Sequence, residues 1–194
     1  LSLLRSLCLG AVIFFAYLIR DVGIVLIPTL FVAQFQSMVF DRKLDMGDLR
    51  KKALPYLVFA LLFVLNTVFK FDGGGNHQSE LQNITIQTIS NNLVLYRNLL
   101  SQYLLGSSLS HVPILWLSPF IFILLGIISE AKYRLQIVTY TGLSFLIYIL
   151  WPHGQGFRFM FPVLPMVVYL MFRGIMSVSV RPRLKYVGIG IVVI

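Results

Sequence analysis

The chain has 194 residues, of which 58% are hydrophobic and 12% are charged, whereas a soluble domain has about 25% charged residues. Mean hydropathy is +0.85, which argues against a soluble globular domain because little polar surface would remain to cover the core. The single cysteine, Cys8, can form no internal disulfide and offers no metal cluster.

Apolar segments recur along the chain at lengths close to the roughly 20 residues that cross a bilayer as a helix. Only helices and closed barrels satisfy the backbone in lipid, and these segments do not alternate with a period of two. We therefore predict an all-α fold, a polytopic transmembrane helical bundle with about six full spans and a truncated seventh. The predicted segments are 2–19, 22–39, 54–70, 112–129, 135–151, 160–177 and 186–194.

Lysine and arginine residues indicate which loops face the cytoplasm. Twelve of the sixteen basic residues lie at the chain start or near 40–53, 130–134 and 173–185. The other four are Arg20, Lys70, Arg97 and Arg158, and we predict that they lie on the outer side. The net charge of +9 is then a topology signal that suits contact with membrane lipids, and it does not indicate nucleic acid as a partner.

The first two apolar segments are joined almost without a loop at Arg20 and Asp21. So short a connection predicts an antiparallel hairpin, in which Asp21 caps the second helix. Arg20 can stay at the membrane interface or pair with an anion.

The predicted outer loop 71–111 contains apolar residues at helical spacing. We expect an amphipathic helix along the outer interface that ends near Gly106. It serves either as a packing element or as one wall of a substrate groove. The apolar positions are Ile89, Leu93, Tyr96, Leu100, Tyr103 and Leu104.

The stretch "WPHGQGFRFMFPVLP", 151–165, is the sharpest polar cluster of the chain. Its prolines and glycines predict a break between two helices on the outer side. Arg158 precedes the helix expected from about 160, and helix N-termini attract anions. A guanidinium beside such an end suits a phosphate, to which His153 and Gln155 could also donate. The alternative is a helix break with interfacial anchors.

Motifs of known catalytic chemistry are not evident. The sequence has no recognised hydrolase triad, P-loop, dinucleotide-binding glycine pattern or metal-ligand cluster. We therefore predict no metal ligand and assign no catalytic residue. No cofactor is evident, and a divalent metal is not indicated.

Two stretches resemble the GT-C superfamily of integral membrane glycosyltransferases. "GQGFRFMFPVLPMVVYLMFRGI", 154–175, resembles the outer loop and following helix of these enzymes, with Arg-Phe before a Pro-x-x-Pro helix start. "FFAYLIRDVGIVLIPTLFVAQF", 14–35, resembles their "T-R-P-x-G-L" hairpin, although Ile19 replaces Thr and Asp21 replaces Pro. The basic inner loop followed by "ALPYLVFALLF" is also similar to the family.

The resemblance implies a transferase that moves a sugar from a polyprenyl- or dolichyl-phosphate carrier to a glycan, lipid or protein acceptor on the non-cytoplasmic side, as in cell-envelope glycan biosynthesis. By position, Arg158 would contact the lipid phosphate, and Arg20 is a second candidate. The family's catalytic carboxylate lies in the first external loop, which we expect to precede this chain.

We therefore expect the chain to be a fragment of a larger protein, with residues 1–194 forming a single transmembrane domain. We place it as a multi-pass protein in a bacterial plasma membrane rather than the endoplasmic reticulum. Two alternatives stay open. One is a polytopic transporter or lipid flippase without covalent chemistry, and the other is a non-catalytic membrane scaffold.

Overall fold

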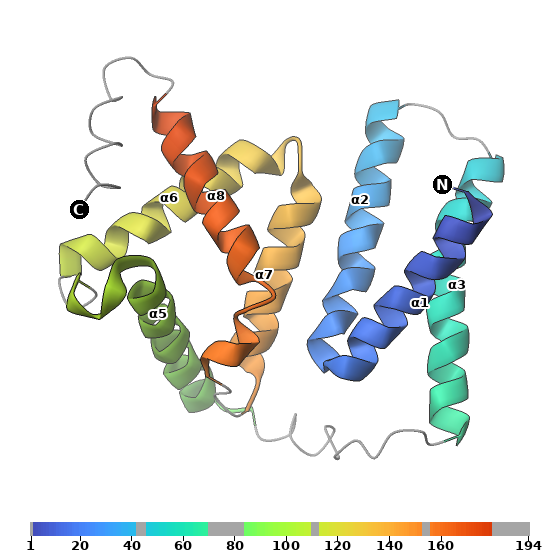
Figure 1. Cartoon of the computed structure of the whole chain (residues 1–194), viewed down its shortest axis with the longest axis horizontal. Coiled ribbons are helices and arrows are strands. Elements are labelled where there is room, and N and C mark those ends of the chain that lie inside the picture. Colours follow the sequence, from blue (N-terminus) through green and yellow to red (C-terminus); the bar gives the residue numbers. More distant parts are fainter. Residues whose placement is uncertain (1, 42–45, 70–83, 110–112, 153–155, 180–194) are drawn as a thin grey trace. The chain divides into compact units, whose positions relative to one another are not determined.

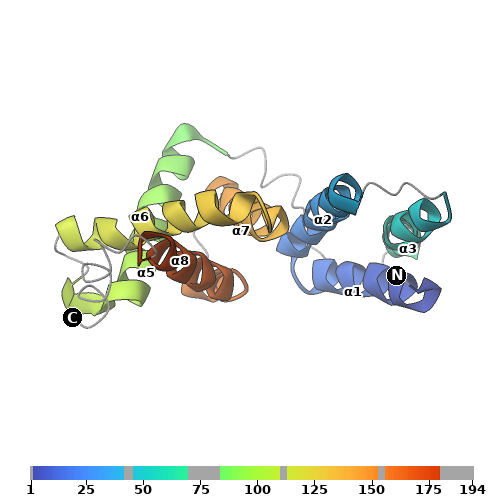
Figure 2. The same cartoon turned by 90° about the horizontal axis from the view of Figure 1, so that it is seen from above.

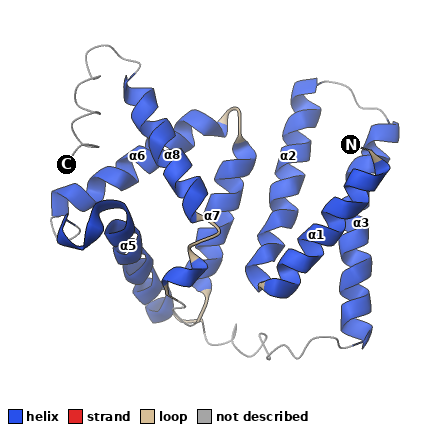
Figure 3. Ribbon diagram, in the orientation of Figure 1, coloured by secondary structure: helices blue, strands red, loops and turns tan. Residues whose placement is uncertain are grey.

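A computed structural model describes residues 2–41, 46–69, 84–109, 113–152 and 156–179. Within these ranges the backbone forms seven α-helices and two short 3-10 helices, and no strand (Figure 3). The prediction of an all-α fold is therefore confirmed. The predicted seventh segment, 186–194, lies outside the described residues.

The chain divides into two compact units, 1–80 and 81–194. The first holds α1 (Leu3–Ile19), the 3-10 helix η1 (Asp21–Val25), α2 (Leu26–Asp41) and α3 (Met46–Phe69). The second holds α5 (Ile86–Leu109), α6 (Pro113–Ala131), α7 (Leu135–Leu150), the 3-10 helix η2 (Phe157–Phe159) and α8 (Leu164–Ser179) (Figure 1). The single transmembrane domain over 1–194 stays a prediction.

In the first unit, α1 packs along α3 with both helices running in the same direction. Gly10 lets the backbones approach, because a Cβ there would lie 2.6 Å from the carbonyl oxygen of Pro55. Four residues further along each helix, Phe14 meets Phe59 edge-to-face with ring centroids 6.0 Å apart. Tyr17 meets the same ring at 6.0 Å. A small residue and aromatic rings thus make the interface.

The predicted direct hairpin of the first two apolar segments is wrong. The 3-10 helix η1 intervenes and packs against the end of α1. A Cβ on Gly23 of η1 would lie 2.5 Å from the carbonyl oxygen of Ala16, so only glycine allows this contact. With η1 occupying that position, α1 finds its main helical partner in α3 rather than α2 (Figure 1).

A polar contact joins α2 to α3 beside a proline. Pro55 lies inside α3, where it lacks the N–H that would complete the helical ladder. Gln34 of α2 donates its amide to the Lys52 carbonyl at 3.1 Å and accepts a hydrogen bond from the Tyr56 hydroxyl at 3.1 Å. A neighbouring helix thereby supplies hydrogen bonds near the proline, one of the ways in which proline-containing helices are stabilised.

Two helices in the described part of the chain are long and apolar enough to cross a membrane, over Val22–Val39 and Leu49–Phe69. Only 6% of each window is buried inside the structure, whereas the core helix of a soluble protein is mostly buried. These two helices favour a membrane protein.

The remaining apolar helices are shorter. A helix of 16 residues, such as α7 or α8, is about 24 Å long, against a hydrocarbon core of roughly 30 Å. Six full spans are therefore not confirmed and stay a prediction. The shorter apolar helices are Leu3–Ile19, Leu117–Ala131, Leu135–Leu150 and Leu164–Val178.

In the second unit, α6 runs across α8 rather than alongside it (Figure 1), and the two helices lie one against the other when seen from above (Figure 2). Two glycines mark the contact. A Cβ on Gly126 of α6 would collide with the carbonyl of Leu170, and one on Gly174 of α8 would collide with the carbonyl of Phe122. Small residues therefore let the two backbones touch.

The helix expected within 71–111 is α5. Its regular geometry is interrupted at Gly106, with φ 77°, a left-handed conformation that glycine adopts without steric cost. On the predicted apolar stripe, Tyr96 and Leu100 are each 3% exposed, but Leu93 is half exposed. The polar Asn92 is buried among them. The position of α5 at a membrane interface stays a prediction.

Candidate functional site

The stretch 151–165 follows α7, and its first residue ends that helix. Trp151 has an extended backbone and donates its N–H to the Ile147 carbonyl at 2.9 Å. The next residue is proline, which disfavours a helical conformation at Trp151. The buried amide of Asn92 in α5 donates to the carbonyl of Ile149 at 3.0 Å and to that of Trp151 at 2.6 Å. A side chain of another helix thus satisfies carbonyls that the end of α7 leaves without helical donors.

Aromatic rings hold the middle of the stretch in place. Tyr148 near the end of α7 is 2% exposed. Its ring lies 5.7 Å from that of Tyr96 in α5 and 6.4 Å from that of Phe159 in η2. Met160 and Val163 follow η2, and each is 1% exposed. Burial therefore fixes the residues that follow Arg158, and the ring contact between Tyr148 and Phe159 ties η2 to α7.

Arg158 is the central residue of η2, and its side chain is exposed. Gly156, two residues earlier, has φ 70°, so the chain enters η2 through a conformation that side chains with a Cβ disfavour. A fixed backbone with an exposed guanidinium is suited to bind an anion from outside the unit. The role of Arg158 in binding a lipid phosphate stays a prediction.

The helix after Arg158 contributes less to an anion site than its position suggested. It begins at Leu164 rather than 160. The N–H groups of Val163 and Leu164 donate to the carbonyl of Met160, and those of Met166 and Val167 donate to the carbonyl of Val163. Pro162 and Pro165 have no N–H. An anion here would depend on the Arg158 side chain rather than on the start of α8.

Arg20 lies in the other unit, between α1 and η1. Its N–H donates to the Ala16 carbonyl at 3.0 Å and its own carbonyl accepts from the Gly23 N–H at 2.7 Å. The side chain is half-buried. Arg20 itself occupies the N-cap position of η1 and makes no side-chain capping bond. Asp21 is the first residue of η1, and its role as a helix cap stays a prediction.

The predictions about His153 and Gln155, metal ligands, cofactors and catalytic residues lie outside the described residues or stay untested. His153 and Gln155 lie in an undescribed part of the 151–165 stretch. The described residues contain no group of three or more His, Cys, Asp or Glu that could hold a metal ion. The expectation that the protein needs no cofactor stays an expectation, and no catalytic carboxylate is assigned.

An apolar groove of about 140 Å³ lies between α5, α6 and α7. It shares Tyr96 with the ring contacts that lead through Tyr148 to Phe159, next to Arg158. Arg97 also lines it and donates to Asn98 from Nε at 3.2 Å and Nη2 at 2.9 Å. The lining residues are Leu93, Tyr96, Arg97, Leu100, Phe120, Phe145 and Ile149.

The groove was not predicted in detail. The helical spacing of Leu93, Tyr96 and Leu100 indicated one wall, and Arg97 was recognised only as one of four outer basic residues. The other wall comes from α6 and α7, and nothing local in the sequence places those helices beside α5.

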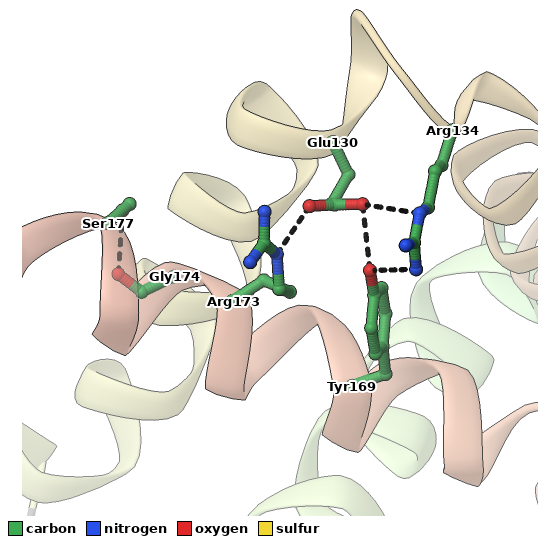
Figure 4. Close-up of polar contacts among 6 residues, drawn as sticks. All are labelled: Glu130, Arg134, Tyr169, Arg173, Gly174 and Ser177. Atoms are coloured by element: carbon green, nitrogen blue, oxygen red, sulfur yellow. Dashed lines mark hydrogen bonds and ion pairs between the residues drawn. The ribbon is translucent and has the colours of Figure 1, made fainter.

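A polar cluster at the other end of α7 was missed altogether. Glu130 at the end of α6 is 1% exposed. Arg173 of α8 donates through Nε to Glu130 Oε1, and the Tyr169 hydroxyl donates to Oε2 at 2.8 Å. Arg134 donates from Nη1 to the Tyr169 oxygen at 2.8 Å, and its Nε lies 3.7 Å from Oε2 (Figure 4). The sequence held one signal that could have indicated this cluster. Glu130 is an acidic residue at the end of an apolar segment, four positions before Arg134.

Opposing effects act on the pKa of Glu130, which lies one residue beyond the predicted span 112–129. Burial raises this pKa, but the hydrogen bonds from Tyr169 and Arg173 and the positive charges of Arg173 and Arg134 together outweigh burial. The pKa is therefore lowered from its ordinary value of 4.5. A carboxylate with a lowered pKa is a weaker general base, and we assign no catalytic role to Glu130.

Comparison of this chain with protein-family models, with curated proteins and with solved structures finds no match. The resemblance to GT-C glycosyltransferases therefore depends on the short motifs in 14–35 and 154–175.

Proposed function

We propose that the chain is the lipid-binding part of a multi-pass membrane glycosyltransferase, which moves a sugar from a lipid-phosphate carrier to an acceptor on the non-cytoplasmic side. One observation carries the proposal. The exposed Arg158 stands on a turn anchored by Tyr148 and Met160, and ring contacts connect this turn to an apolar groove. A phosphate joined to a long apolar chain suits such a surface, because its negative charge can pair with Arg158 and its apolar chain can pack in the groove.

The reaction gives Arg158 a defined task. An acceptor hydroxyl attacks the anomeric carbon of the sugar and loses its proton to a carboxylate, while the bond from that carbon to the phosphate oxygen breaks. The lipid phosphate leaves as an anion. A fixed guanidinium stabilises the negative charge that develops on the leaving oxygen. Arg158 would act by this charge and by hydrogen bonds, and no carboxylate of this chain is assigned as the base.

The experiment compares Arg158→Ala with the unchanged protein in membranes that carry the full-length protein. Transfer of a labelled sugar from a polyprenyl-phosphate donor is expected to fall by about 100-fold, the cost of losing one preorganised donor to a developing anion. Arg158→Lys should restore part of the rate, because lysine keeps the charge but not the forked geometry. Arg50→Ala, at an exposed arginine of the other unit, is the matched control.

Two results would count against the proposal. Unchanged transfer and donor affinity in Arg158→Ala would remove the residue from the site. Movement of the intact lipid-linked sugar across reconstituted vesicles, with no new glycosidic bond, would instead favour a transporter or flippase.

A further inference from the structure

The arginines around Glu130 have hydrogen-bond donors for which the described part of the chain shows no acceptor. Arg173 bonds to Glu130 through Nε, and none of the described residues accepts a hydrogen bond from its Nη atoms. Its side chain is 41% exposed, and that of Arg134 is 55% exposed, whereas the Glu130 side chain is 2% exposed. The carboxylate is thus enclosed while both guanidinium groups reach the surface.

The charges of the cluster do not cancel. Two arginines against one carboxylate leave a net charge of about +1. The exposed Lys132 lies in the turn between α6 and α7, two residues before Arg134, and adds a further positive charge. Such a site attracts an anion beyond the carboxylate that it already holds.

The cluster is also rigid enough to present those donors in a fixed orientation. Glu130 holds the Nε side of Arg173, and Tyr169 donates to the same carboxylate while accepting from Arg134 (Figure 4). The contact of Gly126 with Leu170 keeps α6 against α8 one turn away. A guanidinium fixed through Nε still presents its two Nη groups as a fork, a geometry that matches two oxygens of a phosphate.

The position of the cluster separates it from Arg158. Arg134 immediately precedes α7, and Trp151 immediately follows it. Since α7 has 16 residues, its ends lie about 24 Å apart. The cluster therefore lies near the start of α7 and Trp151 at its end, and the cluster is among the residues that the basic pattern predicts to be cytoplasmic.

We propose that Arg173 and Arg134, held by Glu130, form a second anion site that binds a phosphate group at the cytoplasmic end of the second unit. The phosphate group belongs either to an anionic lipid of that leaflet or to a free phosphate in solution. The site does not depend on the transferase activity proposed above.

The test measures binding to the purified chain in neutral-detergent micelles by titration calorimetry. All proteins carry Arg158→Ala, so that the opposite end does not contribute. The probes are a short-chain phosphatidylglycerol, inorganic phosphate, and a short-chain phosphatidylcholine as the zwitterionic comparison. Arg173→Lys, which keeps the charge and loses the fork, is expected to lower the affinity for phosphatidylglycerol at least tenfold, a change of about 1.4 kcal/mol.

Arg50→Lys makes the same chemical change at an exposed arginine outside the cluster. The affinity of this variant for phosphatidylglycerol should not change. If Arg173→Lys does not fold, as judged by its thermal midpoint, Arg134→Lys is measured in its place. Its affinity for phosphatidylglycerol is expected to fall by a smaller factor. Binding of phosphatidylglycerol alone identifies the lipid as the source, and additional binding of inorganic phosphate shows that the phosphate group suffices. Equal affinities in Arg173→Lys and Arg50→Lys, or phosphatidylglycerol binding no tighter than phosphatidylcholine, would overturn the proposal.

Discussion

The side-chain amide of Asn92 donates to the carbonyl of Trp151 at 2.6 Å, joining residues 59 positions apart. The bond ties the start of the 151–165 stretch to α5, in addition to the bond from the Trp151 N–H to Ile147 of α7. Because Asn92 also binds the Ile149 carbonyl, one buried side chain holds both the end of α7 and the start of the stretch with Arg158 against α5.

Replacing Asn92 with alanine should therefore destabilise the second unit. Two partly buried carbonyls would lose their donor, at a cost of about 1–3 kcal/mol, and the thermal midpoint in detergent should fall. The neighbouring Asn91 is exposed, and its side chain accepts a hydrogen bond from Gln87, so Asn91→Ala should change the free energy of unfolding by less than about 0.5 kcal/mol. Equal effects of the two substitutions would contradict the role given to Asn92.

Gly126→Ala should separate α6 from α8. A Cβ at this position collides with the Leu170 backbone, which cannot rotate away as a side chain could. The expected loss of stability is about 1–3 kcal/mol, measured by thermal unfolding in detergent. Gly142→Ala in α7 is the matched control, because nothing lies within 4 Å of a Cβ there. It should stabilise the helix by roughly 0.5–1 kcal/mol, and a stabilising Gly126→Ala would show that the two backbones are not in contact.

Glu130→Gln should leave two arginines without their carboxylate. Removing one partner of a fully buried ion pair costs roughly 3–5 kcal/mol. We expect about 2 kcal/mol because Arg173 and Arg134 are partly exposed and water can solvate them. A double-mutant cycle with Arg173→Gln should give a coupling of about 1 kcal/mol, and strictly additive losses would mean that the ion pair contributes nothing.

The same carboxylate predicts a pH dependence of stability. Since the pKa of Glu130 is lower in the folded protein than its ordinary value of 4.5, the folded state binds this proton less readily than the unfolded state. The stabilisation is therefore fully present above pH 4.5 and is lost as pH falls through the lower folded pKa. Denaturation in detergent should show the unchanged protein and Glu130→Gln converging in stability on acidification, and a constant difference would contradict the prediction.

Much of the local structure could be read from the sequence, and the errors have identifiable causes. Apolar runs predicted six of the helices, and helical spacing predicted α5 with an end near Gly106, where the structure has an interruption and the helix continues to Leu109. The positions at which helices begin were predicted less accurately. The segment expected from 160 begins at Leu164, after a turn in which the Met160 carbonyl accepts the N–H groups of Val163 and Leu164.

In the candidate site, too, some residues could be recognised from the local sequence and others could not. Arg158 and its surrounding glycines and prolines stood out because they interrupt an apolar pattern. Glu130 did not stand out, since its partners Tyr169 and Arg173 lie 39 and 43 positions away and each looks ordinary within its own helix.

By itself, the sequence determined that the described chain is helical and largely apolar and that Arg158 lies in a break between helices. These properties follow from short-range periodicity and from the backbone restrictions of glycine and proline. Only the tertiary structure decided that α1 packs on α3, that α6 crosses α8 at Gly126 and that Glu130 meets two arginines. Those pairings depend on which helix surfaces fit one another in three dimensions, because residues far apart in sequence meet only when packed backbones bring them together.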